Sequence, residues 1–380
     1  MSFAIGVDRS LFPVTKNLIY LNHAAVAPLP KPAGLAIQGF AQDAMDWGSL
    51  HYQVWMQACE GIRGELSRMI GCTEGEVALI KNTSEGIATV QMGINWRKGD
   101  IIVAFREEFP ANFYCWKLLE SRKECQIRWL SIYDPLDAID KACEGARLLA
   151  ISWVNYLSGF RVDLAAIGEI CKRNGTFFFV DAIQGLGAFP LDVKACGIDA
   201  LAADGHKWLL GPEGWGVLYV AQHRQDEIFP VEFGWTTVKN WANYASRDME
   251  LRSDAGRYEP GTLNVVGSFG LRASMKLLND FGIEEVQGRV MALAGRLEDG
   301  MRKLGAEFLV ERNADNGSGI VSCRFANYDS QKLVAELREK HIIAVHRQGW
   351  VRFSPHYYLE LGEMDVVIDT VHDSLKGGKS

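Results

Sequence analysis

An aspartate and a lysine, 26 positions apart, are the residues of this chain best suited to act together on one ligand. Asp181 stands in the segment VDAIQ (180–184) and Lys207 in the segment ADGHKW (203–208). A lysine amine has a pKa of about 10.4 in water, so it condenses with an aldehyde only where a site favours the neutral nitrogen. A carboxylate can keep a pyridine nitrogen protonated, and the pyridinium ring then draws electrons away from a substrate Cα. The pair suits a cofactor that carries both an aldehyde and a pyridine ring.

The elements that must position these residues are strands of a parallel sheet. The run TFFFV (176–180) reads as a strand that is buried on both faces, and Asp181 stands at its carboxyl end, where ligands of such sheets bind. A second run, VALI (77–80), is followed by NTSEG (82–86), which opens an amphipathic stretch. Its exposed amides, its helix dipole and the Thr83 and Ser84 hydroxyls suit a phosphate, although a simple capping box needs no ligand.

The joint pattern resembles a known family. Asp-Ala-x-Gln at 181–184, followed by His-Lys-x-x-x-Gly-Pro at 206–212, is similar to the class V aminotransferase and cysteine desulfurase family of fold-type I enzymes. That resemblance implies pyridoxal 5′-phosphate as cofactor, Lys207 as its Schiff-base partner and proton carrier, and Asp181 as the partner of its ring nitrogen. His206 is expected beside them as a third catalytic residue.

Further cofactor contacts follow from the same resemblance. Phe109 is expected to stack on the ring. The resemblance implies that desulfurases of the family carry a histidine at this position. Asn155 and Gln184 are expected at the phenolic oxygen. His206 and Asp204 flank the lysine and are expected to position phosphate or ring; many relatives have serine or threonine where this chain has Asp204, which leaves the role of this carboxylate open.

The resemblance also implies substrate contacts and a partner chain. Arg352, in the strand-like segment GWVRFSPH (349–356), matches the arginine that grips an α-carboxylate, for which a guanidinium fork is well suited. Asn22 and His23 are expected in a loop that closes over the substrate. Thr262 is expected to reach the phosphate of a neighbouring subunit, which predicts a homodimer, although the segment PGTL (260–263) also makes an ordinary turn.

Composition excludes several classes of protein. The chain has 380 residues, 48% of them hydrophobic, and a formal net charge of −7, so it has no basic patch for nucleic acid. Its eight cysteines show no Cys-x-x-Cys spacing, so neither a metal site nor a disulfide framework is expected. No window approaches the length of a membrane span, and we expect a cytoplasmic protein without membrane contact.

The order of elements predicts the fold class α/β, with two domains. Strand-like and helical runs alternate over 19–266, which is typical of a large domain with a mostly parallel sheet flanked by helices. After that, helices at 268–281, 284–304, 330–340 and 363–375 accompany strands near 319–325, 341–346 and 350–354. We expect these elements, with residues 1–18, to form a smaller α+β domain of 1–18 and 267–380.

The sequence lacks the motifs that two competing functions need. A nicotinamide enzyme is disfavoured, because 185–187 lacks a third glycine and 211–216 precedes a strand instead of opening a helix. In the family that this chain resembles, desulfurases carry a cysteine nucleophile on a mobile loop. Here no cysteine stands near Arg352, and Cys323 lies in an apolar run, so cysteine desulfuration is disfavoured.

The chain is most similar to isopenicillin-N-epimerase-like members of the family, a functionally mixed group. We expect an aminotransferase that acts on an α-amino acid. The alternative is a carbon–sulfur lyase or an amino-acid epimerase, and the least favoured hypothesis is a non-catalytic family member. An epimerase needs a second acid, for which His23 or Tyr114 are the candidates.

Overall fold

The computed structural model describes residue 3 and residues 6–377, and its larger sheet has seven strands. In spatial order these strands are β2 (Val77–Ile80), β8 (Gly216–Val220), β7 (Ala200–Asp204), β6 (Phe177–Asp181), β5 (Leu148–Ser152), β3 (Asp100–Phe105) and β4 (Cys125–Leu130). Residues 1–2, 4–5 and 378–380, at the ends of the predicted smaller domain, lie outside the described residues.

The strands of this sheet bring their carboxyl ends together at one edge. β4, β3, β5, β6 and β7 are parallel neighbours, while β8 runs antiparallel to both β7 and β2. Because the direction reverses on each side of β8, β2 points the same way as the parallel strands. The residues that follow β2, β3, β5, β6 and β7 therefore meet at the edge where ligands of such sheets bind.

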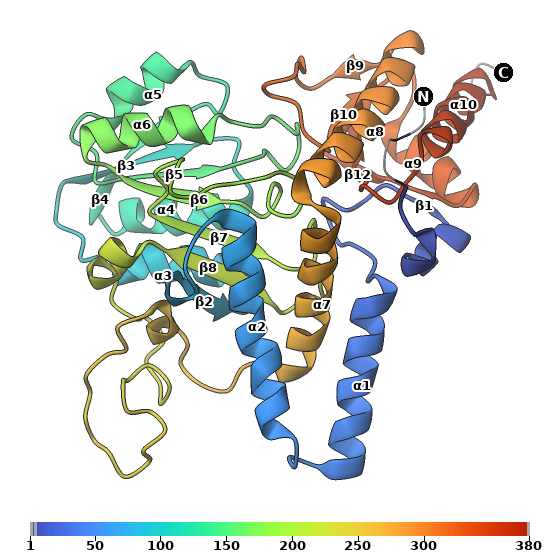
Figure 1. Cartoon of the computed structure of the whole chain (residues 1–380). Coiled ribbons are helices and arrows are strands. Elements are labelled where there is room, and N and C mark those ends of the chain that lie inside the picture. The colour runs from blue at the N-terminus through green and yellow to red at the C-terminus, as the bar shows by residue number, and fades with distance from the viewer. Residues whose placement is uncertain (1–2, 4–5, 378–380) are drawn as a thin grey trace.

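Helices cover both faces of the larger sheet, because its strands alternate between two buried clusters. α3 (Thr83–Gly93) and α4 (Pro110–Ser121) pack on the face that carries Ala150 and Phe179. α5 (Leu136–Cys143) and α6 (Leu164–Asn174) lie side by side and pack on the face that carries Phe178 and Val180 (Figure 1). Every residue of β5, β6 and β7 is buried, as expected for strands covered on both sides.

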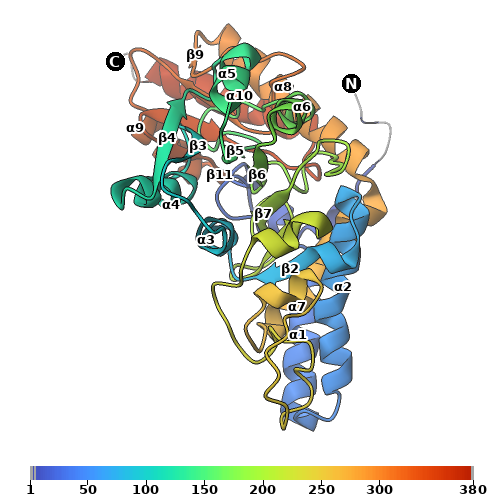
Figure 2. The ribbon, with the colours of Figure 1, turned by 90° about the vertical axis from the view of Figure 1, so that its left-hand side faces the viewer.

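Three long helices form a separate group beside the sheet. α1 (Lys31–Trp47) and α2 (Tyr52–Ile70) both pack along α7 (Val265–Phe281). In both ribbon views these helices and the loop 229–254 project from the sheet in the same direction (Figures 1 and 2). The short 3-10 helices of the chain are η1 (Arg9–Leu11), η2 (Pro13–Lys16), η3 (Glu74–Glu76), η4 (Gln222–Glu227) and η5 (Ala255–Tyr258).

The smaller group of elements is built on an antiparallel sheet. Its strands, in spatial order, are β12 (Val345–Arg347), β13 (Trp350–Phe353), β10 (Val321–Arg324) and β9 (Glu307–Phe308). They are accompanied by α8 (Ile283–Lys303), α9 (Ser330–Glu339) and α10 (Leu361–Gly377). A two-stranded parallel pair joins β1 (Ile19–Tyr20) to β11 (Ile342–Ile343), so the start of the described chain lies against its last third.

The predicted fold class is confirmed: a mostly parallel sheet flanked by helices is combined with a smaller α+β part. The domain boundaries remain a prediction. Two elements cross them, because α7 packs along α1 and α2 and β1 pairs with β11. Within residues 6–377, no helix has both the length and the apolar character needed to cross a membrane.

Candidate active site

A cavity of about 670 Å³ lies at the edge where the strands of the larger sheet end. Most of the side chains that the sequence singles out line this cavity. They are Thr83, Ser84, Phe109, Asp181, Gln184, Asp204, His206, Lys207 and Arg352. The segments that carry them follow β2, β3, β6 and β7 of the larger sheet, with one residue on β13 of the smaller sheet. The cavity therefore lies between the two sheets.

Lys207 lies just beyond the end of β7, in a turn that is fixed by backbone hydrogen bonds from Gly205 to Trp215 and from Gly211 to Gly205. Burial lowers the pKa of its amine to about 8, although the nearby carboxylates of Asp181 and Asp204 oppose this shift. Its Nζ lies 5.7 Å from the centre of the Phe109 ring. A substantial fraction of the amine is thus neutral near pH 8, as a nucleophile toward an aldehyde must be.

Asp181 ends β6 and is buried at the floor of the cavity. Burial raises the pKa of its carboxyl to about 6, while the Ile183 N–H and the Lys207 charge act in the opposite direction. The Ile183 N–H donates to Oδ1 at 3.1 Å. A cationic ring nitrogen placed against such a carboxylate gains more than it would in water, because the surroundings are poorly solvated.

The N-terminus of α3 faces the same cavity. The Asn82 side chain caps this helix by accepting from the Glu85 N–H, and Thr83 and Ser84 occupy its first turn. Among the described residues, the buried Thr83 Oγ1 has no hydrogen-bond partner. A hydroxyl without a partner at a helix N-terminus fits an anion such as a phosphate group.

Asp204 accepts a hydrogen bond from one of the N–H groups at this helix end. The Thr83 N–H donates to Asp204 Oδ1 at 2.6 Å, and burial raises the pKa of this carboxyl to about 7. His206 Nδ1 lies 3.6 Å from Asp204 Oδ2. Burial and the Lys207 charge lower the pKa of His206, so the imidazole is neutral at pH 7. Asp204 therefore fixes the position of α3 relative to the lysine turn.

Arg352 closes the opposite side of the cavity from β13. Its Nη1 donates to the Tyr156 carbonyl at 2.6 Å, but within residues 6–377 it has no carboxylate partner and its Nε has no hydrogen-bond partner. Burial, together with the charge of Arg347, lowers its pKa to about 10, so the group stays charged at neutral pH. A buried guanidinium without a counter-ion is costly, and a substrate carboxylate would remove that cost.

The predicted N-terminal substrate contacts are placed differently from the prediction. Both ring nitrogens of His23 are within hydrogen-bond distance of protein groups, at 2.8 Å from the Ser354 carbonyl and 2.8 Å from the Tyr358 hydroxyl, and burial holds its pKa well below the usual range. Asn22 forms a β-bridge with Ser354. Neither side chain lines the cavity, whereas the next residues, 24–26, do. A direct contact of His23 or Asn22 with substrate stays a prediction.

The two amides expected at a phenolic oxygen already have protein partners. Asn155 donates to the Glu107 carbonyl at 2.7 Å and accepts from the Ser158 N–H at 2.9 Å. Gln184 donates to the Ala24 carbonyl at 3.0 Å and accepts from Trp208 Nε1 at 2.9 Å. Gln184 thus lines the cavity while holding the 24–26 loop in place, and Asn155 shapes the turn behind it.

Some cavity residues are missed by reading the sequence. Tyr156, Arg347 and Gln348 line the cavity. Tyr156 directly follows Asn155, so the strand end is a usable signal for it. Arg347 ends β12 and Gln348 stands in the turn that follows it, and no pattern in the sequence singles them out. Thr262 lies outside the cavity, in a separate pocket of about 100 Å³ next to Lys81 and Glu85.

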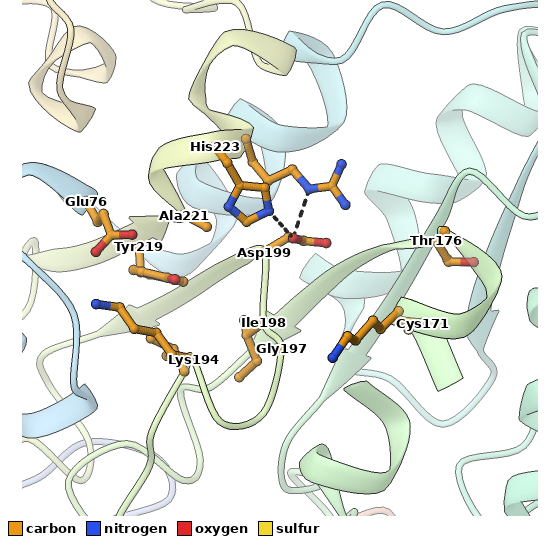
Figure 3. Close-up of a pocket in the computed structure, with 14 residues that line it drawn as sticks. Glu76, Cys171, Thr176, Lys194, Gly197, Ile198, Asp199, Tyr219, Ala221 and His223 are labelled. Atoms are coloured by element: carbon orange, nitrogen blue, oxygen red, sulfur yellow. Dashed lines mark hydrogen bonds and ion pairs between the residues drawn. The ribbon is translucent and has the colours of Figure 1, made fainter. Parts of the chain in front are cut away.

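A cavity of similar size at the opposite edge of the larger sheet lacks these features. It measures about 500 Å³ and contains Asp199, which precedes β7. Figure 3 shows the Asp199 carboxylate in contact with His223 and with a guanidinium, which is that of Arg224 at 2.9 Å. The Asp199 carboxylate is thus already neutralised by protein groups. The cavity around Lys207 is the better candidate for chemistry.

Comparison with known proteins places this geometry in context. The family model "Aminotransferase class-V" matches residues 19–351. A probable cysteine desulfurase of Pyrococcus abyssi is 29% identical, with 98% of each chain covered. An uncharacterized aminotransferase of Bacillus subtilis, YcbU, is 26% identical, with 96% of each chain covered. The structure of an apo cysteine desulfurase from Thermococcus onnurineus superposes with a TM-score of 0.90 at 25% identity, over 99% of this chain and 100% of that one.

Proposed function

This chain belongs to the class V aminotransferase family of pyridoxal-phosphate-dependent enzymes, and from that premise we propose that it is a carbon–sulfur lyase. It would cleave the Cβ–S bond of an α-amino acid whose sulfur already carries a substituent. The observation that carries the proposal is a cavity with the amine, the acid and the arginine for amino-acid chemistry, but without a thiol. Relatives named cysteine desulfurase favour a sulfur-containing substrate.

The absence of a thiol from the cavity lining, among the described residues, supports one of two kinds of sulfur chemistry. All eight cysteines lie within residues 6–377, and none lines the cavity. Cys323 is buried within β10, and burial raises the pKa of its thiol to about 12. A thiol of this kind is a poor nucleophile at neutral pH. We therefore propose elimination, in which the sulfur leaves with its own substituent, over transfer of sulfur to a protein cysteine.

Each residue then has a defined task. Pyridoxal phosphate, when bound, supplies an aldehyde that holds the substrate nitrogen and a ring that withdraws electrons from Cα. Lys207 removes the Cα proton, since part of its amine is neutral near pH 8. Asp181 holds a proton on the ring nitrogen, and Arg352 binds the α-carboxylate. The Thr83 and Ser84 hydroxyls at the N-terminus of α3 hold the phosphate.

The elimination balances without an external oxidant. The Cα–H electrons form a Cα–Cβ double bond as the Cβ–S bond breaks, and the sulfur departs with that bond's electron pair as a thiolate. Water then converts the three-carbon product to pyruvate and ammonia. The net products are one thiol, one pyruvate and one ammonia for each amino acid and water consumed.

The test is to incubate the holoenzyme with S-methyl-L-cysteine in the absence of any keto acid. We expect equal amounts of thiol, pyruvate and ammonia, with the cofactor absorbance unchanged at the end. Lys207→Ala is the matched control and should release none of them. Accumulation of pyridoxamine phosphate without thiol would overturn the lyase proposal.

Transamination is the second candidate, favoured by the Bacillus subtilis relative named as an aminotransferase. It would use the same residues, with Lys207 moving the substrate proton while the Cβ–S bond stays intact. Epimerisation needs a second acid, and neither of the predicted acids lines the cavity: His23 is packed elsewhere and Tyr114 lines a neighbouring pocket. The narrower resemblance to isopenicillin-N-epimerase-like members stays a prediction.

A further inference from the structure

We propose that a pocket beside the active-site cavity receives the sulfur substituent of the substrate, and that this substituent is aromatic. This inference rests on the proposed lyase function. The pocket, called the annex below, measures about 530 Å³. The side chains that define it are those of Phe113, Tyr114, Tyr133, Tyr156, Leu157 and Leu309.

The annex adjoins the cavity, because Pro110, Tyr156 and Gln348 line both. Gln348 Nε2 donates to the Tyr156 hydroxyl at 2.9 Å, and Tyr156 packs edge-on against Phe109 with ring centres 5.2 Å apart. These side chains form the border between the two spaces. A substituent longer than a methyl group has to cross this border to be accommodated.

The border lies close to the position expected for the carboxylate of a bound amino acid. Gln348 stands in the tight turn between β12 and β13, at φ 49°, and is followed by Gly349 at φ 87°. Arg352, on the same hairpin, donates to the carbonyl of Tyr156. A carboxylate at Arg352 therefore lies beside Tyr156, close to the border with the annex.

The walls of the annex favour an aromatic group. Four of its side chains are aromatic, and Tyr114 and Tyr133 are 67% and 42% exposed there. Rings of this kind gain from edge-to-face contacts with a further ring, and pockets lined in this way suit flat apolar groups. Large exposed aromatic side chains around a hollow are also a usual mark of a binding site.

The charges of the annex favour a neutral substituent. The Glu107 carboxylate accepts from the Ser131 hydroxyl and the Ile132 N–H, both at 2.9 Å. The Glu108 carboxyl is buried and accepts from the Ser152 N–H at 2.6 Å. The Arg106 guanidinium, by contrast, has neither an ion pair nor a hydrogen bond within the described part of the chain. Hydrogen bonds from neutral donors leave the Glu107 carboxylate charged, so it balances the Arg106 cation across the annex, and a neutral ring fits better than a charged one.

The experiment compares two ligands that differ in size but leave as similar alkyl thiolates. The holoenzyme is titrated with S-benzyl-L-cysteine and with S-methyl-L-cysteine, and the change in cofactor absorbance gives a Kd for each. We expect the benzyl compound to bind at least about tenfold more tightly, in line with what an apolar pocket discriminates. Pyruvate release, followed in parallel, reports on the lyase function separately.

Two variants locate the preference. Leu309→Trp fills the annex, and we expect it to remove the preference for the benzyl compound. Tyr133→Ala is the second variant, for the case in which Leu309→Trp does not fold. It removes one wall of the annex at a half-exposed position and should weaken the preference for the benzyl compound. Leu118→Trp, at an exposed leucine of α4 outside the annex, is the matched control and should keep the preference.

The outcomes separate the two proposals. Equal affinity for both ligands, or a preference that survives in both annex variants, would overturn the annex. Selective binding of the benzyl compound without pyruvate release would support the annex and refute the lyase. A holoenzyme whose absorbance responds to neither amino acid would refute both.

Discussion

At the scale of single residues, the reactivity of the site depends on how burial changes two titratable groups. The pKa of the Lys207 amine is lowered to about 8 and that of the Asp181 carboxyl is raised to about 6. Each shift moves the group toward its neutral form, because both lie in the same poorly solvated cavity. A bound pyridinium ring would reverse the shift at Asp181, since it brings a positive charge to the carboxylate.

Covalent loading of the cofactor-free protein with pyridoxal phosphate should accelerate as the pH rises through about 8. The folded-state pKa of Lys207 lies below its ordinary value, so the reactive neutral amine predominates above pH 8 and is the minority form below it. The rate of formation of a borohydride-reducible link, followed from about pH 6.5 to about pH 9.5, would check this; an ordinary lysine would give a midpoint above pH 10. Lys207→Ala, the control, should form no such link.

Asp181→Asn should load normally but remove the Cα proton about 100-fold more slowly or worse, because an amide cannot stabilise the ring nitrogen's positive charge. Exchange of the substrate Cα hydrogen for solvent deuterium, measured by NMR, reports this step whatever the product. Asp137→Asn, at an exposed position of α5, is the matched control. Exchange at the wild-type rate in Asp181→Asn would refute the role given to this carboxylate.

At the scale of elements, the position of α3 depends on how closely it can approach the sheet. Gly86 lies in the first turns of this helix, and a Cβ there would stand 2.6 Å from Ala202 Cβ on β7 and 2.9 Å from Ile80 Cδ1 on β2. No side chain fits into that space without moving the helix. The missing side chain therefore sets the distance between the N-terminus of α3 and the lysine turn after β7.

Gly86→Ala should lower the free energy of unfolding by about 1–3 kcal/mol, as overpacking does, and should also weaken pyridoxal phosphate binding. Urea unfolding and cofactor titration measure the two effects. Gly39→Ala in α1 is the control: nothing lies within 4 Å of its added Cβ, so it should be neutral or stabilising by up to about 1 kcal/mol. If both variants behaved alike, close packing of α3 would not be what positions the phosphate site.

The strand ends of the site are predictable from sequence, whereas the contacts between the two sheets are not. Each strand end is marked locally, since a short apolar run stops at a polar residue such as Asp181 or Asn155. Which residue of the 22–26 loop faces the cavity is decided by pairing with Ser354, more than 300 positions away. The same holds for Gln348, which reaches the cavity only because its hairpin packs against Tyr156.

At the scale of the whole molecule, two segments carry large apolar side chains that are exposed to solvent. Met45, Trp47 and Leu50, where α1 leads into α2, and Tyr244 and Met249 in the projecting loop are all 60–77% exposed. Thr262 lies in a separate pocket of its own. Exposed apolar side chains of this size usually mark a protein interface. They support the predicted homodimer, in which Thr262 would contact the phosphate bound by the partner subunit. The cytoplasmic location stays a prediction.

Mixing two impaired chains would test this arrangement. Lys207→Ala lacks the amine and Thr262→Ala lacks the hydroxyl, but in a mixed dimer one site would receive an intact copy of each. Co-expression should restore up to about a quarter of the wild-type sites, which is the statistical share in a symmetric dimer. Light scattering should give twice the mass of one chain. Activity no greater than that of Thr262→Ala alone would mean that Thr262 serves its own subunit.

Gly282 joins the helices that pack beside the larger sheet to those of the smaller part of the molecule. It is the single residue between α7, which packs along α1 and α2, and α8, which packs on α10 and β10. Its φ of 93° is one that other residues adopt only with strain. Lys207 belongs to the part of the chain before Gly282, and Arg352 belongs to the part after it. An amino acid that contacts both Lys207 and Arg352 would thus bridge the two parts of the molecule, and its carboxylate would stabilise their arrangement as well as anchor the substrate.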